Sequence, residues 1–85
     1  IVKKKITLEY YELVLSGKKK FELRLNDFEI KEGDTLILEE WDPKTKQYTG
    51  RSIEKKVSYV LKFDLNMFGQ KQQIIDKGLL VIQME

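Results

Sequence analysis

A cationic turn followed by alternating charged and apolar residues carries the densest group of potential ligand-binding side chains. Residues 17–24 have the sequence GKKKFELR. Their period-two pattern is typical of a half-buried strand, so Glu22 and Arg24 are expected to project from the same face. A carboxylate beside a forked guanidinium, with Lys19 and Lys20 nearby, suits a planar, phosphate-bearing ligand such as a nucleotide. The alternative is a solvent-exposed Glu–Arg pair of little energetic consequence.

A second candidate group flanks a polar turn further along the chain. Trp41 lies on one side of this turn, and Tyr48 and Arg51 lie on the other. Aromatic rings beside a cation form a stacking surface for unpaired bases, and each stacked base contributes roughly 1–3 kcal/mol. A single Trp in a small domain is also a common core residue, whereas Tyr48 and Arg51 are expected to be exposed. Neighbouring acidic residues repel phosphate and favour contact with a base: Glu39, Glu40 and Asp42.

The apolar periodicity predicts the elements that position these groups. We expect an edge strand over 2–7, a helix over 8–16 with Thr7 as N-cap, and a helix stop at Gly17. Four further strands are predicted over 20–25, 35–41, 47–61 (interrupted at 49–50) and 79–84, the last as a buried closing strand. Turns are expected at 30–34 and 42–47, and a loop with a helical turn over 65–77. The sum is a single α+β domain over 1–85, with a mostly antiparallel, barrel-like sheet and one or two flanking helices.

The composition excludes several classes of site. The 85 residues include neither Cys nor His. This excludes the usual zinc sites, iron–sulfur clusters, catalytic thiols and His-dependent triads. The aspartates lack the spacing of a metal-binding loop, and the glycines form no phosphate-binding motif. We therefore predict no metal and no cofactor.

The charge balance and hydropathy limit the partners. A net charge of +2 is too even for a protein that coats duplex DNA by bulk electrostatics. Lysine runs at 3–5 and 18–20 are compatible with a local basic face, although such runs also keep edge strands soluble. The longest apolar run, at 79–82, is too short to cross a bilayer, so we expect a cytoplasmic protein without a membrane partner. The sequence begins with Ile1 rather than Met, so we expect a trimmed or tagged N-terminus.

The order of these motifs resembles the ASCH domains of the PUA-like superfamily, in particular a small bacterial and phage subfamily. Residues 17–24 match the signature G-x-K-x-x-E-x-R, with Gly17, Lys19, Glu22 and Arg24 at its fixed positions. Further blocks follow in the expected order: Asn-Asp at 26–27, Gly-Asp at 33–34, Glu-Trp-Asp-Pro at 40–43 and Tyr-Thr-Gly-Arg at 48–51. The resemblance covers about residues 5–61.

This resemblance implies a PUA-like β-barrel, with a cleft between the first helix and the barrel that is lined by Lys19, Glu22 and Arg24. It also implies binding of RNA or modified nucleosides, and some members hydrolyse N4-acetylcytidine. The hydrolase members have a threonine where this chain has Glu22, and their further catalytic glutamate has no match after residue 61. The subfamily's His near the first strand is absent, and Phe28 stands where a basic residue is common.

Three functions remain open. The first is a module that binds RNA or a nucleotide through Lys19, Lys20, Glu22 and Arg24 and an aromatic ring. The second is an amidohydrolase on N4-acetylcytidine-like nucleosides, with Lys19 as general base beside Glu22. The third is a phage or bacterial protein-interaction module that docks through an edge strand or hairpin. The absence of His removes the usual group that titrates near neutral pH and therefore favours binding over catalysis.

Overall fold

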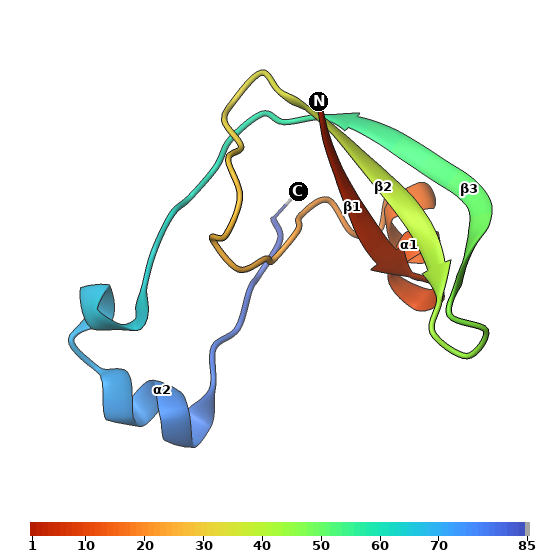
Figure 1. Ribbon diagram of the computed structural model, residues 1–85. Coiled ribbons are helices and arrows are strands. Elements are labelled where there is room, and N and C mark those ends of the chain that lie inside the picture. The colour runs from red at the N-terminus through yellow and green to blue at the C-terminus, as the bar shows by residue number, and fades with distance from the viewer. Residues whose placement is uncertain (85) are drawn as a thin grey trace.

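A three-stranded mixed sheet forms the centre of the fold, which the computed structural model describes for residues 1–84 (Figure 1). β1 (Val2–Thr7) pairs in parallel with the central strand β2 (Thr35–Asp42), and β2 pairs antiparallel with β3 (Gln47–Lys56). The parallel pairing arises because the chain crosses over through α1 (Leu8–Leu15) before it returns as β2. The α+β class and the edge position of the first strand are confirmed, but the sheet is mixed rather than mostly antiparallel, and it is not closed.

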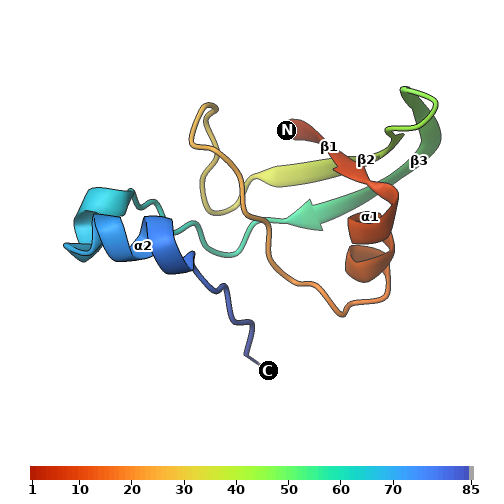
Figure 2. The same ribbon diagram turned by 90° about the horizontal axis from the view of Figure 1, so that it is seen from below.

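Helix α1 covers one face of the sheet (Figure 2). The core lies between the helix and the sheet. Tyr11 and Val14 are three residues apart and so share the buried side of α1. They meet Ile6 of β1 and Leu38 of β2, and Leu38 is the most deeply buried side chain, with 1% exposure. Two partly buried residues extend this cluster along the sheet: Leu36 and Ile53. The core is therefore small and centred on β2.

The ends of α1 follow the sequence signals. Thr7 is the N-cap in an extended conformation, although its side chain makes no capping hydrogen bond. Glu9 in the first turn suits the positive end of the helix dipole. The helix ends because Gly17 has a φ of 81°, a left-handed conformation that glycine adopts without steric cost. The chain therefore turns sharply into the cationic residues 18–20.

The predicted strands over 20–25, 57–61 and 79–84 are not confirmed: all three segments lack strand pairing in the structure. β3 ends at Lys56, whose partner Thr35 is the first residue of β2. Val57 still makes backbone hydrogen bonds with Gly33 and Asp34 of the preceding turn, but no strand pairs with the residues beyond it. The closing segment is exposed rather than buried, and Leu80 has 86% exposure. Alternation of apolar residues is not sufficient for a strand, which also needs a neighbouring strand to pair with.

The C-terminal arm contains the helical turn expected between residues 65 and 77. It consists of the 3-10 helix η1 (Leu65–Phe68) and the short helix α2 (Lys71–Lys77). In Figure 1 this arm extends away from the sheet before the chain returns toward residues 18–20. Among the described residues, no helix has the length and apolar character needed to cross a membrane.

Candidate functional site

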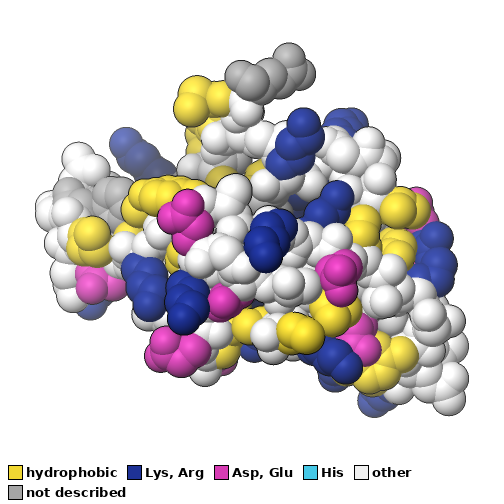
Figure 3. Space-filling view, turned by 90° about the horizontal axis from the view of Figure 1, so that it is seen from above, with side chains coloured by type: hydrophobic (Ala, Val, Ile, Leu, Met, Phe, Trp, Pro, Cys, Tyr) yellow, Lys and Arg dark blue, Asp and Glu magenta, His cyan; other side chains and the backbone are white. Residues whose placement is uncertain are grey.

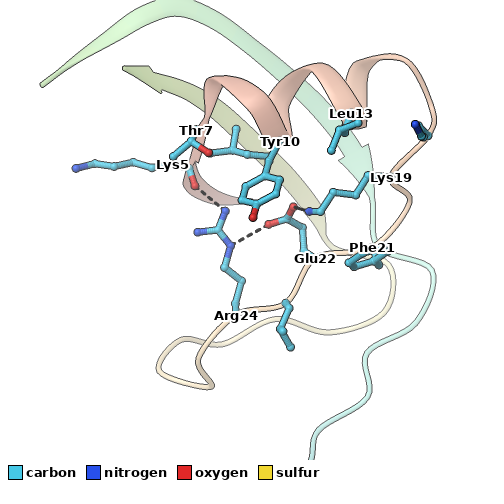
Figure 4. A pocket seen from close by; sticks show the side chains of 11 residues that line it. Lys5, Thr7, Tyr10, Leu13, Lys19, Phe21, Glu22 and Arg24 are labelled. Carbon is cyan, nitrogen blue, oxygen red and sulfur yellow. Dashed lines mark hydrogen bonds and ion pairs between the residues drawn. The ribbon is translucent and has the colours of Figure 1, made fainter. Parts of the chain in front are cut away.

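A cleft of about 660 Å³ lies beside β1, between α1 and residues 18–24 (Figure 4). Four cationic residues and one carboxylate line it, together with apolar and aromatic side chains; the charged residues are Lys5, Lys18, Lys19, Arg24 and Glu22. The excess of cations makes this cleft suitable for an anionic ligand.

Glu22 lies at the centre of the charged groups and joins two of the predicted site residues. Its Oε1 accepts a hydrogen bond from Nζ of Lys19 at 2.6 Å, and its Oε2 accepts one from Nε of Arg24 at 2.9 Å (Figure 4). The side chains of Glu22 and Lys19 are only 17% and 14% exposed. The predicted placement of Glu22 and Arg24 on one side of the chain is therefore confirmed, and Glu22 fixes the positions of both cations.

Arg24 also links residues 20–25 to the sheet. Its Nη2 donates to the backbone carbonyl of Lys5 at 2.6 Å. β1 is an edge strand, so this contact satisfies a backbone group that has no strand neighbour on that side. Residues 20–25 are therefore held at the edge of β1 by a side chain, where the sequence predicted a strand. The other terminal nitrogen, Nη1, makes no hydrogen bond to the described residues.

Lys19 is held in the cleft by its backbone and its side chain. Its N–H donates to the carbonyl of Leu13 at 2.9 Å, which anchors the turn to the end of α1. Its Nζ lies 5.4 Å from the ring centroid of Tyr10 and 5.0 Å from that of Phe21, within the range of cation–π attraction. Lys20, by contrast, is exposed and does not line this cleft.

Trp41 and Tyr48 form a separate aromatic pair. Their ring centroids are 4.9 Å apart in an edge-on arrangement, and Nζ of Lys5 lies 3.8 Å from the centroid of the Trp41 ring. Trp41 is partly buried and lies outside the core cluster, so the core interpretation of this residue is wrong. Tyr48 is half exposed, as expected. We call Lys5, Trp41 and Tyr48 the aromatic cluster.

Lys5 connects the aromatic cluster to the cleft, a role that sequence reasoning missed. Its carbonyl binds Arg24, while its ammonium group lies over Trp41. The sequence alone predicts only a basic segment or a protected edge strand for this lysine run. The alternation along β1 could have revealed this role, because the side chains of Lys3 and Lys5 must project from the face of the strand opposite to that of Ile6. Tyr10, which also lines the cleft, was interpreted only as a helix residue.

Arg51 lies away from the cleft, and its guanidinium group is hydrogen-bonded to other residues. Its guanidinium donates to both carboxylate oxygens of Glu40, at 2.9 and 2.8 Å, and also to Glu12 of α1. It stacks on Tyr11, with its Cζ 4.6 Å from the ring centroid, and Thr49 donates to Glu40 at 2.6 Å. The expected grouping of Arg51 with Trp41 and Tyr48 is therefore not found. Instead, Arg51 fastens α1 to the sheet.

A break in the strand register directs these side chains toward Glu40. Glu39 pairs with Ser52 and Trp41 pairs with Tyr48, so β3 carries three residues opposite the single residue Glu40. Gly50, with a φ of 93°, adopts the left-handed conformation that such a bulge requires. The interruption predicted at residues 49–50 is thus confirmed as a bulge, and its role is to satisfy a buried carboxylate.

These contacts shift the pKa values of Glu40 and Arg51. Hydrogen bonds from Arg51 and then from Thr49 lower the pKa of Glu40 from 4.5 to about 2, against the opposing effect of burial. Hydrogen bonds to Glu40 and Glu12 raise the pKa of Arg51. Glu40 is only 3% exposed, so the carboxylate depends on these partners for its charge.

Stability is therefore expected to depend on Glu40 in acid. A carboxyl whose pKa is lower in the folded state stabilises the fold above its unfolded pKa, and this stabilisation is lost as pH falls from about 4.5 to about 2. Urea unfolding of the Glu40→Gln variant should show a weaker pH dependence in this range and lower stability at neutral pH. Glu54→Gln, on the exposed part of β3, is the matched control. An unchanged pH dependence in Glu40→Gln would contradict this account.

The remaining charges are dispersed. Figure 3 shows Lys and Arg side chains interspersed with Asp and Glu on the face seen from above, without a broad field of one sign. Within the part of the chain that the structure describes, no three Asp or Glu residues are grouped in a way that could hold a metal ion.

Comparison with known proteins gives two findings. A family model described as a domain of unknown function, DUF3850, matches residues 1–75. The chain is also 43% identical over 56 residues to an uncharacterized 12.9 kDa protein in the GpA 3' region of Escherichia phage P2. This match covers 66% of the chain but only 50% of the phage protein, so it spans half the length of that relative. No solved structure gives a significant match.

Proposed function

The chain belongs to the DUF3850 domain family, and we propose that it is a PUA-like module of the ASCH type that binds single-stranded RNA or a nucleotide. The ligand would lie in the cleft between α1 and residues 18–24. One observation carries this proposal: four cationic residues and a single carboxylate line a cleft that also presents aromatic rings. The cations would attract the phosphate of such a ligand, and an aromatic ring would stack with its unpaired base.

The contacts suggest a division of roles. Lys18 and Lys19 attract phosphate, and Arg24 offers Nη1, which makes no hydrogen bond to the described residues. Glu22 orients Lys19 and Arg24 and has both oxygens engaged, so we infer that it positions the cations rather than contacting the ligand. Tyr10 and Phe21, which flank Lys19, provide the adjoining apolar surface.

The aromatic cluster extends this interface. Lys5 belongs both to the cleft and to the cluster, so a strand of two or more nucleotides leaving the cleft would meet Tyr48 and Trp41 next. Stacking on such rings tolerates any base, which suits binding without a strict sequence requirement. Arg51 is not included, because its guanidinium is engaged by Glu40 and Glu12.

We extend the proposal to the PUA-like barrel itself. A hollow of about 1060 Å³ lies between the sheet and the unpaired segments 20–25, 57–61 and 79–84. Its apolar lining includes Leu23, Leu25, Leu61 and Leu80. Pairing of these segments would close the sheet and bury that lining. In that case Leu80→Ala should cost about 2–5 kcal/mol in urea unfolding, as a core truncation does. A change within about 0.5 kcal/mol, as expected at an exposed surface site, would contradict closure.

Fluorescence provides a direct test of the binding function, because Trp41 is the single tryptophan. Titration with short oligouridine should change the Trp41 emission, and affinity should fall steeply from about 50 mM to about 200 mM salt. Duplex RNA of the same length should bind more weakly, because its bases are already stacked. Absence of binding at low salt would contradict the proposal. Hydrolysis of added N4-acetylcytidine would indicate the amidohydrolase instead.

A further inference from the structure

The turn that carries Lys19 also makes an unusual contact with the distant C-terminal segment. The side-chain oxygen of Gln83 accepts a hydrogen bond from the backbone N–H of Lys20. The side-chain nitrogen of the same amide donates to the backbone carbonyl of Lys18 at 3.1 Å. One carboxamide thus satisfies a donor and an acceptor that lie two residues apart on the turn.

This donor and acceptor are held in place before any partner arrives. Gly17 adopts its left-handed conformation at the end of α1, and the N–H of Lys19 is bonded to the carbonyl of Leu13. The turn is therefore anchored on both sides of Lys18, and the Lys18 carbonyl and the Lys20 N–H make their hydrogen bonds to a group from outside the turn, Gln83. Gln83 is exposed and does not belong to the core cluster between α1 and the sheet, so its side chain can leave without disrupting that cluster.

The chemistry of the contact defines what else can occupy it. The amide of Gln83 offers an acceptor oxygen and a donor nitrogen on one carbon atom. The ring amide of a nucleobase, such as O4–C4–N3–H of uracil, has the same arrangement. A trans peptide unit does not, because its C=O and N–H point in opposite directions. The Lys18 carbonyl and the Lys20 N–H together therefore favour a primary carboxamide or a nucleobase edge over a peptide backbone.

We propose that the Lys18 carbonyl and the Lys20 N–H form a reading site for the Watson–Crick edge of a nucleobase, and that Gln83 occupies this site in the free protein. The inference rests on the proposed binding function and deepens it, because it assigns base recognition to backbone groups of the turn. Lys18 and Lys19 belong to the same turn and line the cationic cleft, so the phosphate of the bound nucleotide remains within their reach. Gln83 then acts as an internal competitor that the ligand displaces.

The test compares wild-type protein with Gln83→Ala, which removes the competing amide. Gln72→Ala is the matched control, because Gln72 is an exposed glutamine of α2 whose side chain is hydrogen-bonded to Asp76. We expect Gln83→Ala to bind oligouridine about threefold to tenfold more tightly than wild type, the range that corresponds to relief of one or two hydrogen bonds. The control should bind as wild type does.

A second ligand separates base reading from general electrostatic attraction. Oligomers of 3-methyluridine keep the phosphates and the ring but lack the N3–H donor, so Gln83→Ala should bind them no more tightly than wild type. Equal binding of oligouridine by Gln83→Ala and wild type, or weaker binding by the variant, would overturn this inference alone. A failure of both proteins to bind oligouridine would overturn the proposed function and the inference with it.

Discussion

Arg24→Ala is expected to weaken oligouridine binding about tenfold or more and to reduce the slope of log affinity against log salt by about one. The substitution removes the guanidinium that offers Nη1 to the ligand. It also releases Oε2 of Glu22 and the carbonyl of Lys5, so the cleft gains an unpaired carboxylate oxygen that repels phosphate. Fluorescence titration at several salt concentrations measures both quantities.

Two further variants make this test specific. Lys31→Ala removes the same charge from an exposed turn outside the cleft and should leave the affinity within about twofold of wild type, since surface charges away from a site have small effects. Arg24→Lys keeps the charge but cannot bridge Glu22 and Lys5 with one planar group, so we expect an intermediate affinity. Equal losses in Arg24→Ala and Lys31→Ala would show that net charge, not the cleft, determines binding.

Leu38→Ala is expected to cost about 2–5 kcal/mol of stability, the range for truncation of a buried leucine. Leu38 lies on the central strand and packs with Ile6, Tyr11 and Val14, so the cavity opens in the middle of the core. Small domains are stable by only about 5–15 kcal/mol, and this loss is therefore a large part of the total. Urea unfolding, monitored by circular dichroism, measures this loss of stability.

The matched control for this prediction is Ile75→Ala in α2. Ile75 is 62% exposed, so removal of its side chain should cost less than about 1 kcal/mol. The comparison tests whether the sheet and α1 contain the stabilising core. A cost in Ile75→Ala that matches Leu38→Ala would show that the C-terminal arm packs more tightly than its exposure indicates.

The sequence determines the N-terminal half of the fold through local signals. Apolar spacing placed α1 and β2 to within one residue, and Gly17 marked the turn after the helix because its positive φ excludes most other residues. The close association of Lys19, Glu22 and Arg24 also followed from spacing along one segment. These features depend on residues near one another in the chain.

The features that sequence reasoning missed depend on contacts between distant segments. The direction of β1 relative to β2 is set by the crossover, which alternation alone does not reveal. Glu40 shares a strand face with Leu38, and a buried carboxylate at that position requires a cation, but only the fold shows that Arg51 supplies it. Likewise, nothing local to Lys20 indicates its contact with Gln83, which is 63 residues away.

The most direct test of the central claim is an NMR titration of the 15N-labelled protein with short oligouridine at low salt. If the cleft binds the ligand, the backbone amides of Lys19, Glu22 and Arg24 should shift progressively, together with the indole N–H of Trp41. Amides of α2, which lies outside the interface, should remain unchanged. Shifts confined to α2 or to other exposed lysines, or no shifts at all, would contradict the assignment of this cleft as a nucleic-acid-binding site.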